Sequence, residues 1–129
     1  MTEVDVLIKE KFVSFRRKVL EHLKEKHPYI IGIVESAMAG RKNKFGLRIT
    51  ENGKTVGEYT LIANGVSIES VEVGILDAAV KHPMLGEFKP YAIIERSDIE
   101  QAIENEEFFT DTFAAAKKFL PNATIKFLE

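Results

Sequence analysis

The chain has 129 residues, of which 18 are Lys or Arg and 20 are Asp or Glu, so its formal net charge is −2. This length suits one domain with its own apolar core, and 45% apolar with 29% charged residues is an ordinary globular composition. The absence of cysteine excludes disulfide frameworks, thiol nucleophiles and cysteine-ligated metal centres. The nearly balanced charge argues against a general nucleic-acid binder.

The chain opens with a predicted amphipathic helix from about residue 3 to about residue 26. Thr2 is its expected N-cap, with Asp5 at the capping-box position, and Pro28 ends it. Apolar side chains recur at steps of four and three along one face: Val4, Ile8, Phe12, Phe15, Val19 and Leu23. Residues 29–39 are ambiguous, because their β-branched composition favours a strand whereas their apolar stripe favours a helix. We prefer a short second helix, since the stripe persists for two turns.

The next thirty residues predict a three-stranded antiparallel meander. Two Asn-Gly pairs, Asn52-Gly53 and Asn64-Gly65, are typical of two-residue hairpin turns in which both positions have positive φ. The strands expected around them are residues 45–51, 54–63 and 66–73. Apolar positions change phase within the third run, which indicates a bulge near Glu69-Ser70.

The second half of the chain alternates helices and strands. Residues 75–80 could form one or two helical turns, and residues 84–90 are expected to form a loop. A buried strand should follow at 91–95, then a helix capped by Ser97 with Glu100 at its capping-box position. The apolar positions of the last expected helix, which Pro121 closes, are Phe109, Phe113, Ala116, Phe119 and Leu120. Residues 123–128 should form a final strand.

These elements predict a single α+β domain over residues 1–129. N-terminal helices precede an antiparallel meander within a five-stranded sheet, and the C-terminal helices pack on that sheet. The longest apolar runs are far shorter than the roughly 20 residues that span a bilayer. With no targeting signal in the sequence, we expect a cytoplasmic protein without stable membrane insertion.

Motifs for catalysis or metal binding are not evident. The eight glycines are too dispersed for a phosphate-binding loop. His22 and His27 are five residues apart, a spacing that places them on different faces of a helix and makes a poor metal pair. We therefore expect no catalytic residue, no metal and no cofactor. An enzyme that pairs a carboxylate with Tyr59 or Tyr91 is the least favoured alternative.

Two charge clusters have an ordinary and a functional interpretation. The acidic stretch from Glu95 to Asp111 could dock a basic partner, but a solvated helix face is favoured. The basic segment Arg41-Lys42-Asn43-Lys44 could meet phosphate or anionic lipid, but a solvated loop is favoured.

Phenylalanine is concentrated at the end of the chain, where five of the nine lie at or after residue 108. Phe109, Phe113 and Phe119 could complete an ordinary core. They could also close an apolar cavity against the sheet, in which a lipid-like ligand is buried. The residue types of a filled core and of a cavity wall are the same, so the sequence leaves both alternatives open.

Two segments give the chain a resemblance to the sterol carrier protein 2 family. Residues 57–68 resemble that family's strand, dipeptide turn and strand, and residues 92–99 resemble its strand followed by an acidic helix start. The order of elements is also similar: a leading helix, a meander, another strand, a helix and a late strand. The chain departs from the family at residues 119–126, where a Gly-Lys-rich strand is usual.

The resemblance implies a non-enzymatic domain that binds or carries lipid or fatty-acyl-like molecules in an apolar cavity between the sheet and the C-terminal helices. Its candidate walls, assigned by face, are Leu61, Ile93, Phe109, Phe113 and Phe119. The alternative is a protein–protein interaction module or a homodimer, with no ligand, that associates through an exposed meander face or the 84–88 loop.

Overall fold

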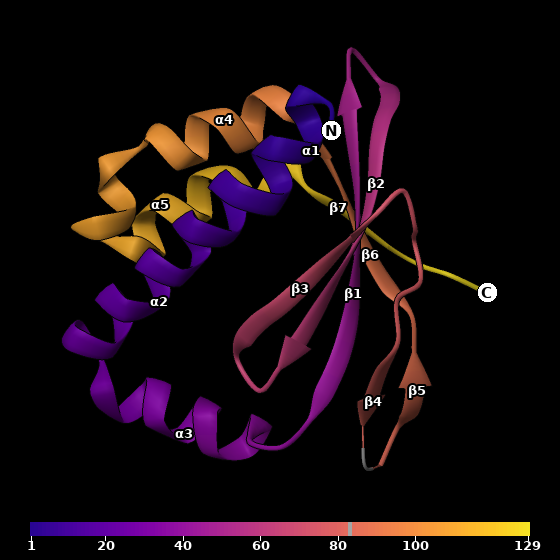
Figure 1. Cartoon of the computed structure of the whole chain (residues 1–129). Helices are drawn as coiled ribbons and strands as arrows, with labels where there is room; N and C mark the ends of the chain where they lie inside the picture. Colours follow the sequence, from indigo (N-terminus) through magenta and orange to yellow (C-terminus); the bar gives the residue numbers. More distant parts are fainter. Residues whose placement is uncertain (83) are drawn as a thin grey trace.

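The computed structural model describes residues 1–82 and 84–129, and it has two layers, with helices on one face of a twisted sheet (Figure 1). The N-terminal half contains α1 (Glu3–Val6), the π-helical turn η1 (Leu7–Phe12), α2 (Val13–Lys26), α3 (Pro28–Met38), β1 (Lys42–Glu51), β2 (Lys54–Asn64) and β3 (Ser67–Val73). The C-terminal half contains β4 (Val80–His82), β5 (Gly86–Phe88), β6 (Pro90–Glu95), α4 (Arg96–Glu104), the 3₁₀ turn η2 (Glu106–Phe109), α5 (Thr112–Phe119), the 3₁₀ turn η3 (Leu120–Asn122) and β7 (Thr124–Phe127). The α+β class and the five-stranded sheet are confirmed.

The sheet is mixed, with the strand order β3-β2-β1-β6-β7. Strand β1 pairs antiparallel with β2 and parallel with β6, while β7 pairs antiparallel with β6 at the far edge. The apolar side chains of β1 and β2 that share one face are buried under the first helix, and they include Leu47, Ile49 and Tyr59. Val4, Leu7 and Ile8 pack on them from above and complete the main core.

The first hairpin turn is as predicted, and the second is shifted by one residue. Asn52 and Gly53 have φ of 54° and 80°, as a type I′ turn requires. In the second hairpin Asn64 pairs with Ser67 at the strand ends, so the loop is Gly65-Val66 and the prediction of an Asn64-Gly65 turn is wrong. Gly65 has a φ of 64°, which suits the first position of a II′-type loop and leaves Asn64 in the strand. The bulge is confirmed, because Ile62 pairs with Ser70 and Ala63 with Ile68, so that Glu69 is the extra residue.

Both N-terminal helices are found, but the first contains a π-helical turn at residues 7–12. Thr2 and Asp5 form the expected capping box. The Tyr59 hydroxyl donates a 2.6 Å hydrogen bond to Asp5 Oδ1, which ties the helix start to the middle of β2. Helix α3 lies at the lower end of the molecule in Figure 1, and several of its large apolar side chains are exposed. Tyr29 is 88% and Ile33 is 69% exposed, and their spacing of four residues places them on one side of the helix.

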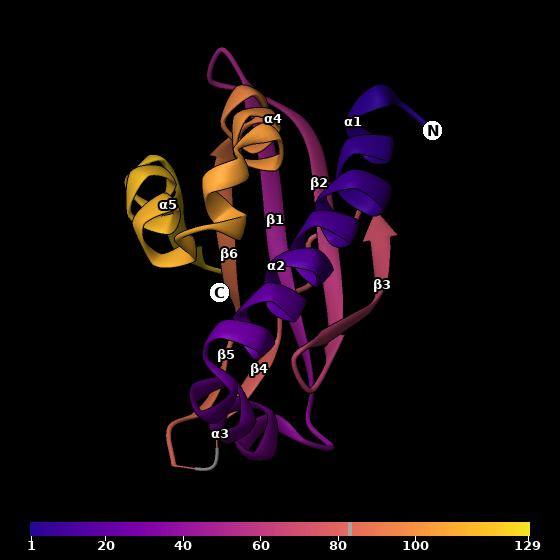
Figure 2. The ribbon, with the colours of Figure 1, turned by 90° about the vertical axis from the view of Figure 1, so that its left-hand side faces the viewer.

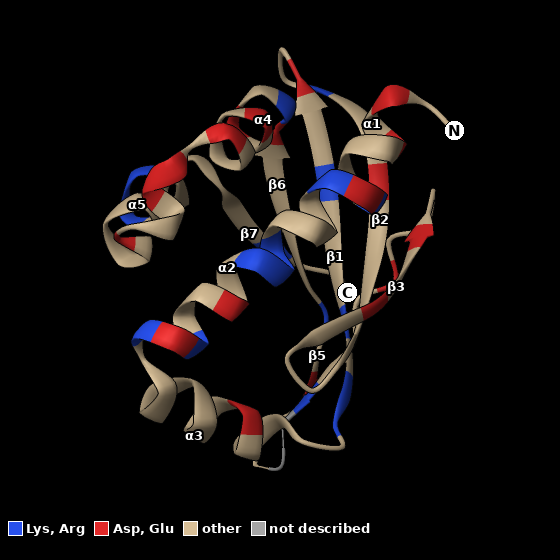
Figure 3. Ribbon diagram, turned by 60° about the vertical axis from the view of Figure 1, so that its left-hand side comes forward, with Lys and Arg blue, Asp and Glu red and all other residues tan. Residues whose placement is uncertain are grey.

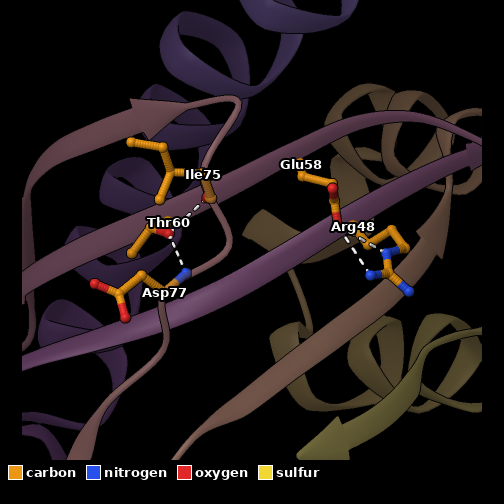
Figure 4. A network of polar contacts seen from close by, with 5 residues as sticks. All are labelled: Arg48, Glu58, Thr60, Ile75 and Asp77. Atoms are coloured by element: carbon orange, nitrogen blue, oxygen red, sulfur yellow. Dashed lines mark hydrogen bonds and ion pairs between the residues drawn. The ribbon is translucent and has the colours of Figure 1, made fainter. Parts of the chain in front are cut away.

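The segment after the meander is extended, so the helical turns predicted at residues 75–80 are wrong. Thr60 provides the physical reason: its buried hydroxyl donates to the Ile75 carbonyl oxygen at 2.7 Å and accepts from the Asp77 N–H at 2.9 Å (Figure 4). Lys44 and Ala79 then exchange backbone hydrogen bonds. These bonds use the backbone groups that a helix would need, and they hold the segment across the sheet face opposite the helices. The expected loop at 84–90 is instead the β4–β5 hairpin and the start of β6; Pro83 lies outside the described residues.

Two helix starts differ from the sequence prediction. Helix α4 begins at Arg96 after Glu95, so Ser97 lies inside its first turn and is not the cap. The last helix begins at Thr112, because the Asp111 carboxylate accepts the Ala114 N–H. Phe109 therefore belongs to the preceding 3₁₀ turn. Figure 2 shows α4, α5 and the first helix side by side over the sheet.

Candidate functional site

An apolar cavity of about 210 Å³ lies between the first helix, α4, α5 and the underlying strand β6. Its walls are almost wholly carbon, and they comprise Phe12, Phe15, Ile94, Ile99, Ala102, Ile103, Phe108, Ala116, Phe119, Leu120 and Ala123. Asp98 completes the lining. Leu120 is 67% exposed, which places it on the solvent side of the cavity.

Three aromatic rings pack together in one wall of the cavity. Phe108 lies edge-on to Phe15, with ring centroids 5.2 Å apart, and 5.7 Å from the ring of Phe119. The backbone of Phe108 is held in turn, since its carbonyl oxygen accepts a 2.6 Å hydrogen bond from the Thr112 hydroxyl. This wall joins residues that are about a hundred positions apart in the chain, so it depends on the tertiary fold.

Asp98 lines the cavity at a solvent-exposed edge, its mouth, and pairs there with the exposed residue Asn122, which is not part of the lining. Asn122 Nδ2 donates to Asp98 Oδ1 at 3.4 Å. This bond links the first turn of α4 to η3, which follows α5 in the chain. Asp98 is the one charged residue among the described residues that line the cavity.

The five wall residues expected from the sequence are not brought together. Phe119 lines the cavity. Phe109 lies outside it, between Phe15 and His22, at 6.0 and 6.4 Å between ring centroids. Phe113 is 52% exposed and its ring lies 5.3 Å from that of His27.

The two predicted strand residues lie elsewhere in the sheet. Leu61 belongs to the main core beneath the first helix. Ile93 pairs with Arg48 on the face opposite the helices, and its neighbour Ile94 faces the cavity. Because apolar residues occupy both phases of this strand, its sequence alone does not show which one points to the helices.

Sequence reasoning missed the contributions of the first helix and of α4. Phe12 and Phe15 were recognised as the apolar face of the first helix, yet nothing marked them as cavity walls. The alanines at 102 and 116 are the signal that could have found the site, since small residues on facing helices leave space unless a larger side chain fills it.

The two tyrosines named as possible catalytic groups have structural partners. The hydrogen bond from Tyr59 lowers the pKa of the Asp5 carboxyl, and the Thr2 N–H strengthens the effect. Burial and the same hydrogen bond raise the pKa of the Tyr59 phenol, so the pair holds its proton on tyrosine. Tyr91 lies on the other sheet face, where the Arg48 guanidinium is 5.2 Å from its ring centroid and donates two hydrogen bonds to Glu58 Oε2 (Figure 4).

Among the described residues, no group of three His, Asp or Glu side chains is placed to hold a metal ion. No helix in the described part of the chain is long and apolar enough to cross a bilayer. No model of a known protein family matches the chain, and no curated protein shows significant similarity to it.

Proposed function

We propose that this domain binds a small apolar or lipid-like molecule in the cavity between the first helix, α4, α5 and β6, without catalysing a reaction. The observation that carries the proposal is the cavity itself, about 210 Å³ in volume and lined by aliphatic and aromatic side chains. An engineered apolar cavity of about 150 Å³ in another protein stays dry and binds benzene. At about 30 Å³ for a group of water-like size, this cavity holds about seven methylene groups.

Two features support a carrier of alkyl or acyl chains over a binder of compact polar metabolites. The described lining contains one charged side chain, at the mouth, so an apolar chain can enter with its polar end left outside. The element order is that on which the resemblance to the sterol carrier protein 2 family rests, with a leading helix, a meander, a strand, a helix and a late strand. We include that family relationship in the proposal.

Native mass spectrometry of freshly purified protein tests this function, followed by titration of the stripped protein with 1-octanol. We expect either a co-purified apolar ligand or saturable binding of one octanol per chain. An apoprotein mass together with no saturable octanol binding would contradict the proposal.

The apolar side of α3 favours a second candidate, self-association into a homodimer. Ile30 is 52% exposed and Ile33 is 69% exposed, one turn apart on the same side of the helix. Light scattering should then show concentration-dependent dimers that Ile33→Lys abolishes. A particle that stays monomeric to millimolar concentration contradicts this candidate. In the 84–88 loop proposed from sequence, Met84 is 89% and Leu85 is 74% exposed, whereas Phe88 is half-buried within the β4–β5 hairpin.

A further inference from the structure

The mouth of the cavity is acidic, and its chemistry bears on the polar end of the ligand. Asp98 lines the cavity from the first turn of α4. Asn122 donates to one of its carboxylate oxygens, Oδ1, and no other hydrogen bond to Asp98 is present in the described part of the chain. The second oxygen can therefore accept a hydrogen bond from a ligand.

Neighbouring cations do not offset this carboxylate. The Arg96 guanidinium is shared among Glu3, Glu51 and Glu100, at 3.3 to 3.9 Å. Lys118 lies 2.8 Å from Glu107. Figure 3 shows further acidic positions along α4 and towards the start of α5. The positive end of the α4 dipole already has Asp98 as its acidic partner in the first turn.

A ligand whose alkyl chain fills the cavity has its polar end at this mouth. A ligand carboxylate there would face Asp98 in a partly dehydrated setting, where like charges repel more strongly than in water. An ammonium or hydroxyl group of the ligand would instead donate a hydrogen bond to the Asp98 carboxylate. A hydrogen bond to a carboxylate is stronger than one between two neutral groups.

We infer that the ligand has an alkyl chain ending in a hydrogen-bond donor, an amine or an alcohol, and that Asp98 discriminates against free fatty acids. This inference rests on the proposed function and refines the class of molecule bound, from any lipid-like chain to one without a terminal carboxylate.

Three ligands of equal chain length provide the test: octylammonium, 1-octanol and octanoate, titrated calorimetrically into the full chain at pH 7. We expect octylammonium to bind at least tenfold more tightly than octanoate, with octanol between them. Asp98→Asn keeps the side-chain size and should reduce the amine-to-carboxylate ratio by about tenfold.

Glu104→Gln is the matched control, because it removes the same charge from an exposed position of α4 that is not part of the cavity lining. It should leave the ratio within about twofold, also in 0.5 M salt, where long-range attraction is screened. Equal binding of all three ligands, tightest binding of octanoate, or an unchanged ratio in Asp98→Asn overturns the inference but leaves the proposed function intact. Failure of all three ligands to bind overturns both.

Discussion

Filling the cavity from α4 should stabilise the fold and weaken ligand binding together. Ala102 lines the cavity, and Ala102→Leu adds three carbons to a space of about 210 Å³. Burial at about 0.8 kcal/mol per methylene gives a gross gain of about 2.4 kcal/mol. Ordering the leucine side chain costs about 0.5–1 kcal/mol. We therefore expect the free energy of unfolding to rise by about 1–2 kcal/mol.

Ligand binding should change in the opposite direction, because the new side chain occupies the volume of about three ligand methylenes. At about 0.8 kcal/mol each, octanol should bind about 50-fold more weakly. Urea unfolding and calorimetric titration measure the two effects on the same samples.

Gln101→Leu is the matched control, since it places the same side chain at the neighbouring exposed position of α4. It should change stability by no more than about 0.5 kcal/mol and leave octanol affinity unchanged. If Ala102→Leu instead destabilises the protein by about 1–3 kcal/mol, as overpacking of a filled core does, the space is not available and the reasoning is refuted.

Three further predictions concern contacts that stabilise the fold outside the cavity. Thr60→Val should destabilise the protein by about 2–3 kcal/mol, because the Ile75 carbonyl and the Asp77 N–H both lose their partner. Thr55→Val, at an exposed position, serves as the control in urea titrations. Equal losses of stability in Thr55→Val and Thr60→Val would contradict the role of Thr60. Tyr59→Phe should cost about 1.5–2 kcal/mol at pH 7. Since the folded pKa of Asp5 lies below its ordinary 3.8, the stability that this pair adds is complete above that pH and is lost as the pH falls through the lowered value. The stability difference between wild type and Tyr59→Phe should therefore shrink below about pH 4, and a difference independent of pH would argue against the ionised pair. Gly46→Ala should destabilise the protein by about 2–3 kcal/mol, because a Cβ at Gly46 would lie 2.6 Å from Tyr91 Cβ. Gly32→Ala is the control in α3, where an added Cβ would have no other atom within 4 Å. It should stabilise the protein by about 0.5–1 kcal/mol in thermal unfolding.

Much of the fold could be predicted because its signals are local. Asn52-Gly53 determines a turn through the φ preferences of two residues, and the phase change in the third strand reports the bulge at Glu69. The helix at residues 28–38 follows from its apolar stripe and from Pro28 at the first position.

The errors arise where distant residues decide local structure. Residues 75–80 have helical composition, but the hydroxyl of Thr60, fifteen residues earlier, binds their backbone in an extended form. The position of Ile94 over the cavity is set by its pairing with Ile49 in β1, which a continuous apolar run does not reveal.

Most wall residues of the candidate site were not predicted from the sequence. The phenylalanines near the chain end left two alternatives open, a filled core and a cavity between the sheet and the C-terminal helices. The apolar cavity in the structure is also lined by the first helix, and of the five named wall residues Phe119 alone lines it. The other phenylalanines could not be placed, because the break at Asp111 separates Phe109 from Phe113 and turns them to different neighbours.

The central claim is that a defined apolar volume in this domain receives an alkyl chain, and titration with 1-alkanols of increasing length tests it most directly. Affinity should rise about 3–4-fold per methylene while the chain fills the cavity, and level off at about seven or eight carbons. In Ala102→Leu the levelling should occur about three carbons earlier. A uniform rise through dodecanol that is the same in both proteins would indicate binding to an exposed apolar surface and contradict the account.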